Sequence, residues 1–452
     1  MGASGSFEHD RSAVGHGAVL RIALPITLSN ATGPLTGVAL IAVIGQSQGA
    51  AEIGGVAVAV AIFSMLLWTF SFLRMATTGL AAQALGAGDR REIAGHGLRA
   101  LLVAACGGVL LIMLQWPIAA AALELMRVSP VVAASAREFF DLRVWSMPAA
   151  LVNFAVFGWL IGLGQARRAF EIQLVLNVLN VALAAALVLG LGFGVRGLAV
   201  ATVIAECLGM IAGLWVARRE AARLGAVAPL ADAVDLARLR RSMAMNSDIA
   251  IRALAHHFVL AFFTSEGAAQ GDATLAANAI LYNLLSVMIF LLDGFAFAAE
   301  TFVGQAIGAQ DRQAFEQAAR ITTRWAVLFA VIVGVVAWFA GDALIALAVK
   351  SEEVRAEART FLVWIALSPL AGVWAFQLDG IFVGATRSRD MRNTMLASVA
   401  AFFVFWWPLS ASFGNHGLWA AYTLFFVVRA ILLGLRLPGL VEASFAGRVR
   451  HQ

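Results

Sequence analysis

The sequence has few charged residues, and this scarcity excludes most classes of protein. Only 13% of its 452 residues are Asp, Glu, Lys or Arg, whereas 61% are hydrophobic. Soluble domains carry about 25% charged and 45–50% apolar residues. With a mean hydropathy of +0.85, the chain is too apolar for a globular fold in water. A soluble enzyme and a disordered chain are therefore excluded, and we expect lipid to surround most of the protein.

Cysteine and lysine are nearly absent. Cys106 and Cys207 both lie within apolar runs, where we expect small core residues rather than a disulfide framework. No Cys/His spacing predicts a metal site, so we expect no metal and no cofactor. Lys350 is the only lysine, so arginine carries the net charge of +5. The arginines recur in short loops between apolar stretches, which is typical of a membrane protein and not of a nucleic-acid-binding one.

The apolar stretches predict transmembrane helices. A membrane-crossing helix needs about 20 mostly apolar residues, and strands of alternating polarity are not seen. We therefore predict an all-α polytopic membrane protein with twelve transmembrane helices. The expected segments are 17–44, 53–85, 97–123, 131–162, 168–191, 196–217, 242–265, 274–307, 317–347, 355–384, 391–412 and 417–438.

Arginine also predicts the orientation of these helices. One set of alternate loops is arginine-rich, including Arg90, Arg167, Arg312 and Arg387, whereas the loops at 45–52 and 266–273 contain no Arg or Lys. The positive-inside rule places the arginine-rich loops and both termini in the cytoplasm, in a bacterial-type inner membrane.

The chain repeats itself at an offset of about 222 residues. GLAAQALGAGDRREI at 79–93 matches TFVGQAIGAQDRQAF at 301–315, and residues 193–198 match 413–418 at an offset of 220. Because six spans return the chain to its starting side, the two halves share one topology and are related by a pseudo-two-fold axis along the membrane normal. Parallel repeats with a site between them are typical of secondary transporters.

The repeat and the charge pattern together predict the domain layout. We expect an N-terminal tail at 1–16, a six-helix lobe at 17–217, a linker at 218–241, a second lobe at 242–440 and a tail at 441–452. Both tails and the linker are predicted to be cytoplasmic.

Acidic residues within the spans are candidates for binding a coupling ion, because charges inside a membrane usually face a partner or a pathway. Asp293 and Glu300 lie two turns apart on one helix face, where the first half has Ser71 and Thr78. Such a pair can hold a proton or a small cation; ordinary helix–helix hydrogen bonds are the alternative. Asp379 and Glu206 are isolated acids in apolar surroundings.

The motif MNSDIAIRALAHH adds a further acid and possible cavity residues. Asp248, Arg252 and His256 are spaced by four and share one helix face, so Asp248 and Arg252 can neutralise each other as a structural pair or act as an ion-sensitive one. We take Asp248 as a further ion-coupling candidate and Asn246, Arg252 and His256 as cavity candidates. Arg74 either extends its charged group to the membrane–water interface or pairs with an acid across the helix bundle.

The first half supplies uncharged polar candidates. Gln173, Asn177 and Asn180 form a stripe at helical spacing that can orient a substrate or join helices. Asn30 is a further cavity candidate. Pro34 removes a helix hydrogen bond, so it is a candidate gating bend or a static kink.

Taken together, these motifs resemble the multidrug and toxic compound extrusion (MATE) family, and within it the DNA-damage-inducible F-type subgroup. The resemblance covers nearly all of residues 17–440 and includes FLRMATTGLAAQALGAGDRREI, LNVLNVAL, LDGFAFAAE and LDGIFVGATRSRDMRN. It implies two six-helix lobes in a V and outward export of organic cations driven by inward flow of H⁺ or Na⁺.

The resemblance has one departure. Members commonly carry an aspartate in the first helix and another after the NxxN of the fifth, where this chain has Leu40 and Ala184. Either ion coupling has moved to Asp293, Glu300, Asp379 or Glu206, or coupling is weakened, or the substrate preference has changed. We favour the first of these alternatives.

The leading hypothesis is a secondary active antiporter that exports drug-like or organic cations in exchange for H⁺, or Na⁺. We expect it to be a monomer that contacts a lipophilic cation and membrane lipid. One alternative is a lipid-linked saccharide flippase of the same broad superfamily, which needs several arginines for phosphate. The other is a membrane-embedded enzyme, for which we find no HExxH, GxSxG or Walker motif.

Overall fold

The computed structural model describes residues 14–126 and 128–446, and in these residues it is almost entirely helical. Eleven helical segments there are long and apolar enough to cross a membrane. The remaining long helix, α11 (Leu236–Ala269), begins with an arginine-rich stretch and also holds Asp248 and Arg252, which lower its hydropathy. With α11 the chain forms twelve long helical units in two lobes, as the sequence predicts.

The helices of the first lobe follow the predicted segments with three interruptions. The elements are α1 (His16–Gly45), α2 (Ala50–Thr69), α3 (Phe72–Gly86), α4 (Arg90–Met113), α5 (Gln115–Met126), α6 (Pro130–Arg143), the short η1 (Val144–Ser146), α7 (Met147–Gly162), α8 (Ala166–Ala185), the π-helical η2 (Ala186–Gly190) and α9 (Gly194–Leu224). The second predicted span is thus two helices, divided at residues 70–71. The third begins seven residues earlier than expected and is divided at Leu114.

The second lobe is built from longer, uninterrupted helices. These are α11, α12 (Asp272–Gly308), α13 (Arg312–Ala348), α14 (Glu352–Gly384), α15 (Ser388–Phe413) and α16 (Asn415–Phe445). Between the lobes lies the four-residue α10 (Ala231–Val234). Helices α9 and α11 extend into both ends of the predicted linker, and α16 extends into the predicted C-terminal tail. Residues 1–13 and 447–452 of the predicted tails lie outside the described residues.

The sequence repeat folds into the same turn in each lobe. Asp89 caps α4 by accepting a hydrogen bond from the Glu92 amide (2.9 Å), and Asp311 caps α13 by accepting one from the Ala314 amide (3.0 Å). Gly88 and Gln310 occupy the same position of the turn and both have a positive φ. The repeated G-x-x-D pattern therefore encodes a helix end followed by a capped helix start.

Repeated glycines let the helices of each lobe pack backbone to backbone. A Cβ on Gly158 would collide with the Arg74 carbonyl, and one on Gly380, at the equivalent position, with the Ala296 carbonyl. Between the lobes, Gly86 lies against the Gln305 carbonyl and Gly308 lies against the Gln83 carbonyl. Small residues allow such close approach in membrane helices, where packing is the main source of helix association.

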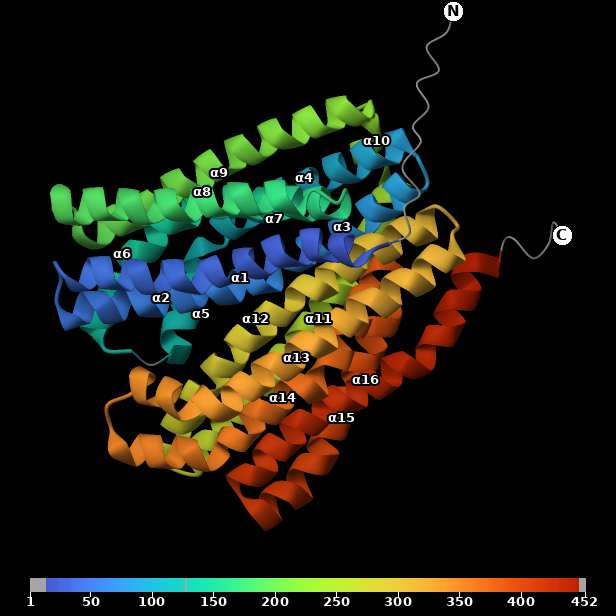
Figure 1. The fold of residues 1–452 in the computed structure, drawn as a ribbon. Coiled ribbons are helices and arrows are strands. Elements are labelled where there is room, and N and C mark those ends of the chain that lie inside the picture. The colour runs from blue at the N-terminus through green and yellow to red at the C-terminus, as the bar shows by residue number, and fades with distance from the viewer. Residues whose placement is uncertain (1–13, 127, 447–452) are drawn as a thin grey trace, which may run out of the picture.

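The lobes meet at one end of the molecule, which we call the closed end and define by the loops at 87–89, 163–165, 309–311 and 385–387. Figure 1 shows the two groups of helices converging toward the side of the chain termini and diverging away from it. Gln83 Nε2 donates to the Gly384 carbonyl (2.8 Å), and Gln305 Nε2 donates to the Gly162 carbonyl (3.2 Å). Because these residues are equivalent in the two repeats, the closed end is held by a two-fold-related pair of hydrogen bonds.

Neither cysteine is a fully buried core residue, contrary to expectation. Cys207 is half-buried, but Cys106 is exposed and is not a core residue. It lies on α4, a helix whose outer face carries other exposed apolar side chains such as Val109 and Leu110. Periodicity cannot tell such a lipid-facing position from a core position when both are apolar.

Candidate functional site

The central feature of the interface between the lobes is a buried ion pair. Arg74 on α3 of the first lobe lies 3.8 Å from Glu300 on α12 of the second. The Arg74 guanidinium also lies over the Phe297 ring, 3.8 Å from its centroid. Arg74 Nη1 and Glu300 Oε2 are buried and have no hydrogen-bond partner among the described residues. The pair is therefore electrostatic, and Glu300 retains an open oxygen that a proton can satisfy.

A second buried cluster surrounds Asp379 on α14. Arg252 on α11 donates a hydrogen bond to Asp379 Oδ2 (3.1 Å), and Arg429 on α16 donates to the same oxygen. Asp379 Oδ1 has no partner among the described residues. Arg252 also reaches Met75 Sδ on α3 of the other lobe (3.3 Å). This cluster thus joins three helices of the second lobe and touches the first.

Asp293 lies between these two groups. It is half-buried on α12 and makes no hydrogen bond or ion pair with any described residue. It is within electrostatic range of Arg74, Arg252 and Asp379. The structure therefore brings three of the predicted ion-coupling acids, Asp293, Glu300 and Asp379, into one region.

Asp248 and Arg252 do not neutralise each other. Asp248 accepts hydrogen bonds from Ser388 Oγ (2.8 Å) and Arg392 Nη1 (2.6 Å) at the start of α15, whereas Arg252 turns to Asp379. A spacing of four fixes the helix face but not the partner, and α15 packs against α11 at this level. Asp248 is therefore part of a separate buried contact near the closed end.

Glu206 lies in the first lobe, away from the other acids. Asn153 on α7 donates a hydrogen bond to Glu206 Oε2 on α9 (2.9 Å). Arg143 is within electrostatic range of Glu206 and lies over the Phe63 ring, 4.5 Å from its centroid. Glu206 thus has an amide partner on α7 and a basic neighbour on α6.

The amide stripe of α8 forms helix–helix hydrogen bonds. Gln173 Nε2 donates to Asn177 Oδ1 (3.1 Å), and Asn177 Nδ2 donates to Thr32 Oγ1 on α1 (2.7 Å). Asn180 Oδ1 accepts from Thr202 Oγ1 on α9 (3.3 Å). These contacts tie α8 to both of its neighbours. At the two positions where the family resemblance leads one to expect acids, Leu40 is half-buried and Ala184 is fully buried.

Helix α1 connects the amide stripe to the second lobe. Asn30 Nδ2 donates to the Phe290 carbonyl (3.0 Å), and Thr27 Oγ1 donates to the Leu291 carbonyl (3.1 Å). These contacts lie beside Asp293. Helix α1 continues through Pro34, which is exposed. Asn30 is thus at the interface between the lobes, and Pro34 is in the part of α1 beyond it.

The last two cavity candidates lie on α11. Asn246 is buried. His256 contacts the rings of Phe425 (5.8 Å between centroids) and Phe426 (6.1 Å), on the same helix as Arg429. His256 therefore packs at the edge of the Asp379 cluster.

Sequence analysis missed two arginines that complete these clusters, Arg429 and Arg143. Arg429 interrupts the run AYTLFFVVRAILLGL, and a lone charge in such a run is a signal for a buried partner. Arg143 closely follows Arg137 and Asp141, which form an ion pair on α6 (3.4 Å), and gives no separate signal. Its place beside Phe63 depends on how α6 packs on α2.

Comparisons with known proteins agree with this architecture. The MatE family model matches residues 25–186 and 251–410. The chain is 38% identical to DNA damage-inducible protein F of Escherichia coli, over 92% of this chain and 90% of that protein. It is 23% identical to a probable multidrug resistance protein NorM of Bacillus cereus, over 82% of each chain. A solved structure with a similar fold is the outward-facing conformation of a multidrug resistance MATE family transporter of the MOP superfamily, which is 17% identical in sequence. The two structures match with a TM-score of 0.84 over 95% of this chain and 96% of that one.

Proposed function

Because the chain belongs to the MatE family of membrane transporters, we propose that it is a secondary active antiporter that exports organic cations in exchange for H⁺, with Na⁺ as the alternative coupling ion. Members of this family are efflux transporters for small molecules, not enzymes, and need no cofactor. The observation that carries the proposal is the buried Arg74–Glu300 pair, because it joins the two lobes inside the membrane-spanning region.

The mechanism follows from what a proton does to that pair. In the arrangement seen here, Glu300 attracts Arg74 across the interface and so favours contact between the lobes. A proton on Glu300, received through Asp293, removes that attraction and satisfies the open Glu300 oxygen. The protonated protein then favours separation at the closed end. An ion shifts such an equilibrium only through its different affinity for the two states, and this pair supplies that difference.

The charge balance of the site argues against an anionic substrate. Arg74 faces Glu300, and Arg252 and Arg429 share Asp379. Asp293, within electrostatic range of Arg74 and Arg252, supplies the third negative charge, so the region has no excess positive charge. A flippase for a lipid-linked sugar needs arginines that are available to phosphate. Asp293, which lacks a direct partner among the described residues, is instead available to a cation. We therefore assign Asp293 to substrate or ion exchange and Glu300 to lobe coupling.

Arginine supports the proposed orientation. Arg90, Arg167, Arg312 and Arg387 lie within two residues of the loops that form the closed end or inside them, so we place this end in the cytoplasm together with both termini. The arrangement seen here is then open to the outside. We further propose that the protein acts as a monomer, with residues 17–217 and 242–440 as the two moving lobes and Pro34 in the outer, bendable part of α1.

Efflux from cells that lack their own pumps tests the proposal. Ethidium retention is compared for the wild type, Asp293→Asn, Glu300→Gln and the control Glu171→Gln, which changes an exposed acid paired with Arg167. We expect both site variants to lose efflux by roughly tenfold or more, since coupling between sites typically amounts to 5–150-fold. The control should export normally. Wild-type efflux by both site variants across external pH would refute this site.

A further inference from the structure

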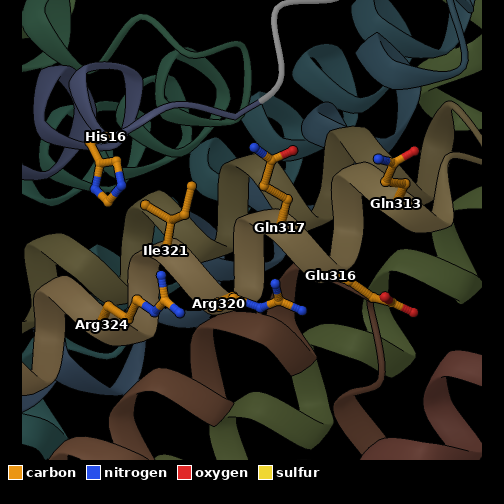
Figure 2. A pocket seen from close by; sticks show the side chains of 7 residues that line it. All are labelled: His16, Gln313, Glu316, Gln317, Arg320, Ile321 and Arg324. Carbon is orange, nitrogen blue, oxygen red and sulfur yellow. The ribbon is translucent and has the colours of Figure 1, made fainter.

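A polar groove lies where the start of α1 meets α13, and we infer that it binds the headgroup of an anionic phospholipid. The groove has a volume of about 550 Å³, and its lining includes His16, Gln313, Glu316, Gln317, Arg320 and Arg324. Figure 2 shows the two arginines one turn apart on α13 and His16 facing this helix from α1. The groove lies outside the ion pairs that the transport proposal uses.

The charge of the groove suits a phosphodiester. Arg320 and Arg324 are both exposed, and neither forms an ion pair with any residue in the described part of the chain. Glu316 also lines the groove, but Arg312 Nε donates to its Oε1 (2.9 Å) and neutralises it. Two unpaired guanidinium groups one turn apart, with the amide of Gln317 on the preceding turn, can donate to the non-bridging oxygens of one phosphate.

The level of the groove relative to the membrane suits a lipid headgroup. A charge-free run begins directly after Arg324 and continues from Trp325 to Gly341, about 26 Å of helix at 1.5 Å per residue. This length is close to the thickness of the hydrocarbon core. Arg320 and Arg324 therefore lie at the headgroup level, and Trp325 lies where interfacial aromatic residues gather. Basic pockets between transmembrane helices at this level are known to bind anionic lipids.

The surface beyond the groove suits acyl chains rather than a free anion. Leu328 (49% exposed) and Ile332 (48%) continue the stripe of Arg324 along α13, and Leu24 (45%) is exposed on α1. A phospholipid whose phosphate lies on Arg320 and Arg324 can place its chains along this apolar surface. Inorganic phosphate has no acyl chains, so this apolar surface adds nothing to its affinity.

The groove also spans the two lobes. Trp325 Nε1 on α13 donates a hydrogen bond to His16 Nδ1 on α1 (3.0 Å). Because α1 belongs to the first lobe and α13 to the second, a lipid held by both helices binds best while they are adjacent. Anionic lipid should then stabilise the closed end, by its preference for that state.

Native mass spectrometry of the purified full chain tests this inference without measuring transport. The protein is titrated with phosphatidylglycerol, with phosphatidylcholine of the same chains, and with inorganic phosphate as competitor. The test variant is R320Q/R324Q, R320K/R324K tests rescue by charge, and R240Q/R241Q is the control. Arg240 and Arg241 are exposed, form no ion pair with a described residue and carry the same charge.

We expect phosphatidylglycerol to bind more tightly than phosphatidylcholine, and R320Q/R324Q to weaken that binding by roughly tenfold or more. The lysine variant should retain most of it, and the control should bind as the wild type does. Equal loss in the control would overturn the inference, as would competition by phosphate at the concentration of the lipid. So would lipid binding that is seen only after residues 1–13 are deleted, because that result would assign the groove to the N-terminal tail.

Discussion

Each acid at the interface of the lobes has a different set of neighbours, and these neighbours decide what each acid can do. Glu300 faces one arginine of the other lobe, Asp379 is held by two arginines of its own lobe, and Asp293 has no direct partner among the described residues. Asp379 is therefore the acid best suited to hold the lobe together. Glu300 and Asp293 are better suited to exchange an ion.

This difference predicts that Arg429 is a residue for stability. Arg429→Met should lower the free energy of unfolding by about 1.5–3 kcal/mol, because Asp379 loses one charged hydrogen-bond partner and keeps only Arg252. The double variant Arg429→Met/Asp379→Asn should be less stable still, because Arg252 then lacks its acid as well. Thermal unfolding in detergent micelles measures both. A single variant that unfolds like the wild type would show that the pair contributes nothing to stability.

The control for this prediction is Arg167→Gln. Arg167 pairs with Glu171 at the surface (2.9 Å), and exposed helical pairs contribute only about 0.3–0.5 kcal/mol. Its unfolding temperature should lie within the error of the wild type.

Sequence reasoning located the acids but not their partners. The pattern of charges within apolar runs identified Asp293, Glu300, Asp379 and Asp248, because any such residue is conspicuous in its own helix. It could not show that Arg252 turns to Asp379 rather than to Asp248, since that choice depends on where α14 and α15 lie. Arg429 was missed, although it is an isolated charge in an apolar run.

At the scale of elements, the repeated loop between α3 and α4, and between α12 and α13, explains how the closed end is held. Gln83 and Gln305 each donate to a carbonyl at the end of a helix of the other lobe. Thr301 Oγ1 adds a third contact to the Ile161 carbonyl (3.0 Å). These neutral hydrogen bonds hold the lobes together but are weak enough to break during transport.

Removing either glutamine should therefore favour opening of the closed end. A net hydrogen bond contributes about 0.5–1.5 kcal/mol, so Gln83→Ala or Gln305→Ala should each raise the open population roughly two- to tenfold. Spin labels at positions 167 and 389, in a background without Cys106 and Cys207, report the distance between the lobes. Gln46→Ala, at the exposed end of α1, should leave the distances unchanged. The effect of Gln83→Ala should be the larger, because Gln83 also donates to Thr386 Oγ1 (3.3 Å). Unchanged distances in both glutamine variants would contradict the latch.

An ion pair between Arg91 on α4 and Asp232 on α10 holds the linker against the first lobe, and this contact should depend on pH. Arg91 Nε and Nη2 both donate to the Asp232 carboxylate (2.7 Å each), and these hydrogen bonds hold the pKa of Asp232 below its usual range. A lowered pKa means that the contact is fully present above the ordinary Asp value of about 3.9 and is lost only as pH falls through the lowered value.

Hydrogen exchange of α10, corrected for the intrinsic rate at each pH, measures this contact. Protection should be constant from about pH 8 to pH 5 and should decrease only below about pH 4. Asp232→Asn should reduce protection at every pH. A decrease between pH 7 and pH 5 in the wild type would show that another group controls the docking of the linker.

The elements themselves were predictable to different degrees. The apolar runs predicted the bounds of the long helices of the second lobe closely, because charged residues or turns mark both ends of each helix. The divisions at residues 70–71 and at Leu114 have weaker marks, namely Thr69 and Ser71 at the first and Gln115 and Pro117 at the second. Pro117 lies in the first turn of α5, where proline is tolerated, so the second division has a local signal that the surrounding apolar run obscures.

At the scale of the whole molecule, the duplication visible in the sequence becomes a two-lobed structure whose halves contact through equivalent residues. The match between residues 79–93 and 301–315 identifies the contact surface, because both segments lie at the closed end. The sequence did not show which end would be closed, since both states of a rocking transporter share one set of residues. Which end is closed therefore depends on the conformation and not on the sequence.

The central claim is that ion movement drives substrate movement through acids of the second lobe. The most direct test uses the purified protein in liposomes with an imposed pH gradient, and separately a Na⁺ gradient, while ethidium movement and internal pH are both recorded. We predict that the pH gradient drives ethidium transport with opposite movement of protons. Glu300→Gln should abolish that dependence. Equal ethidium transport with and without either gradient, or a gradient response that persists in Glu300→Gln, would contradict the account.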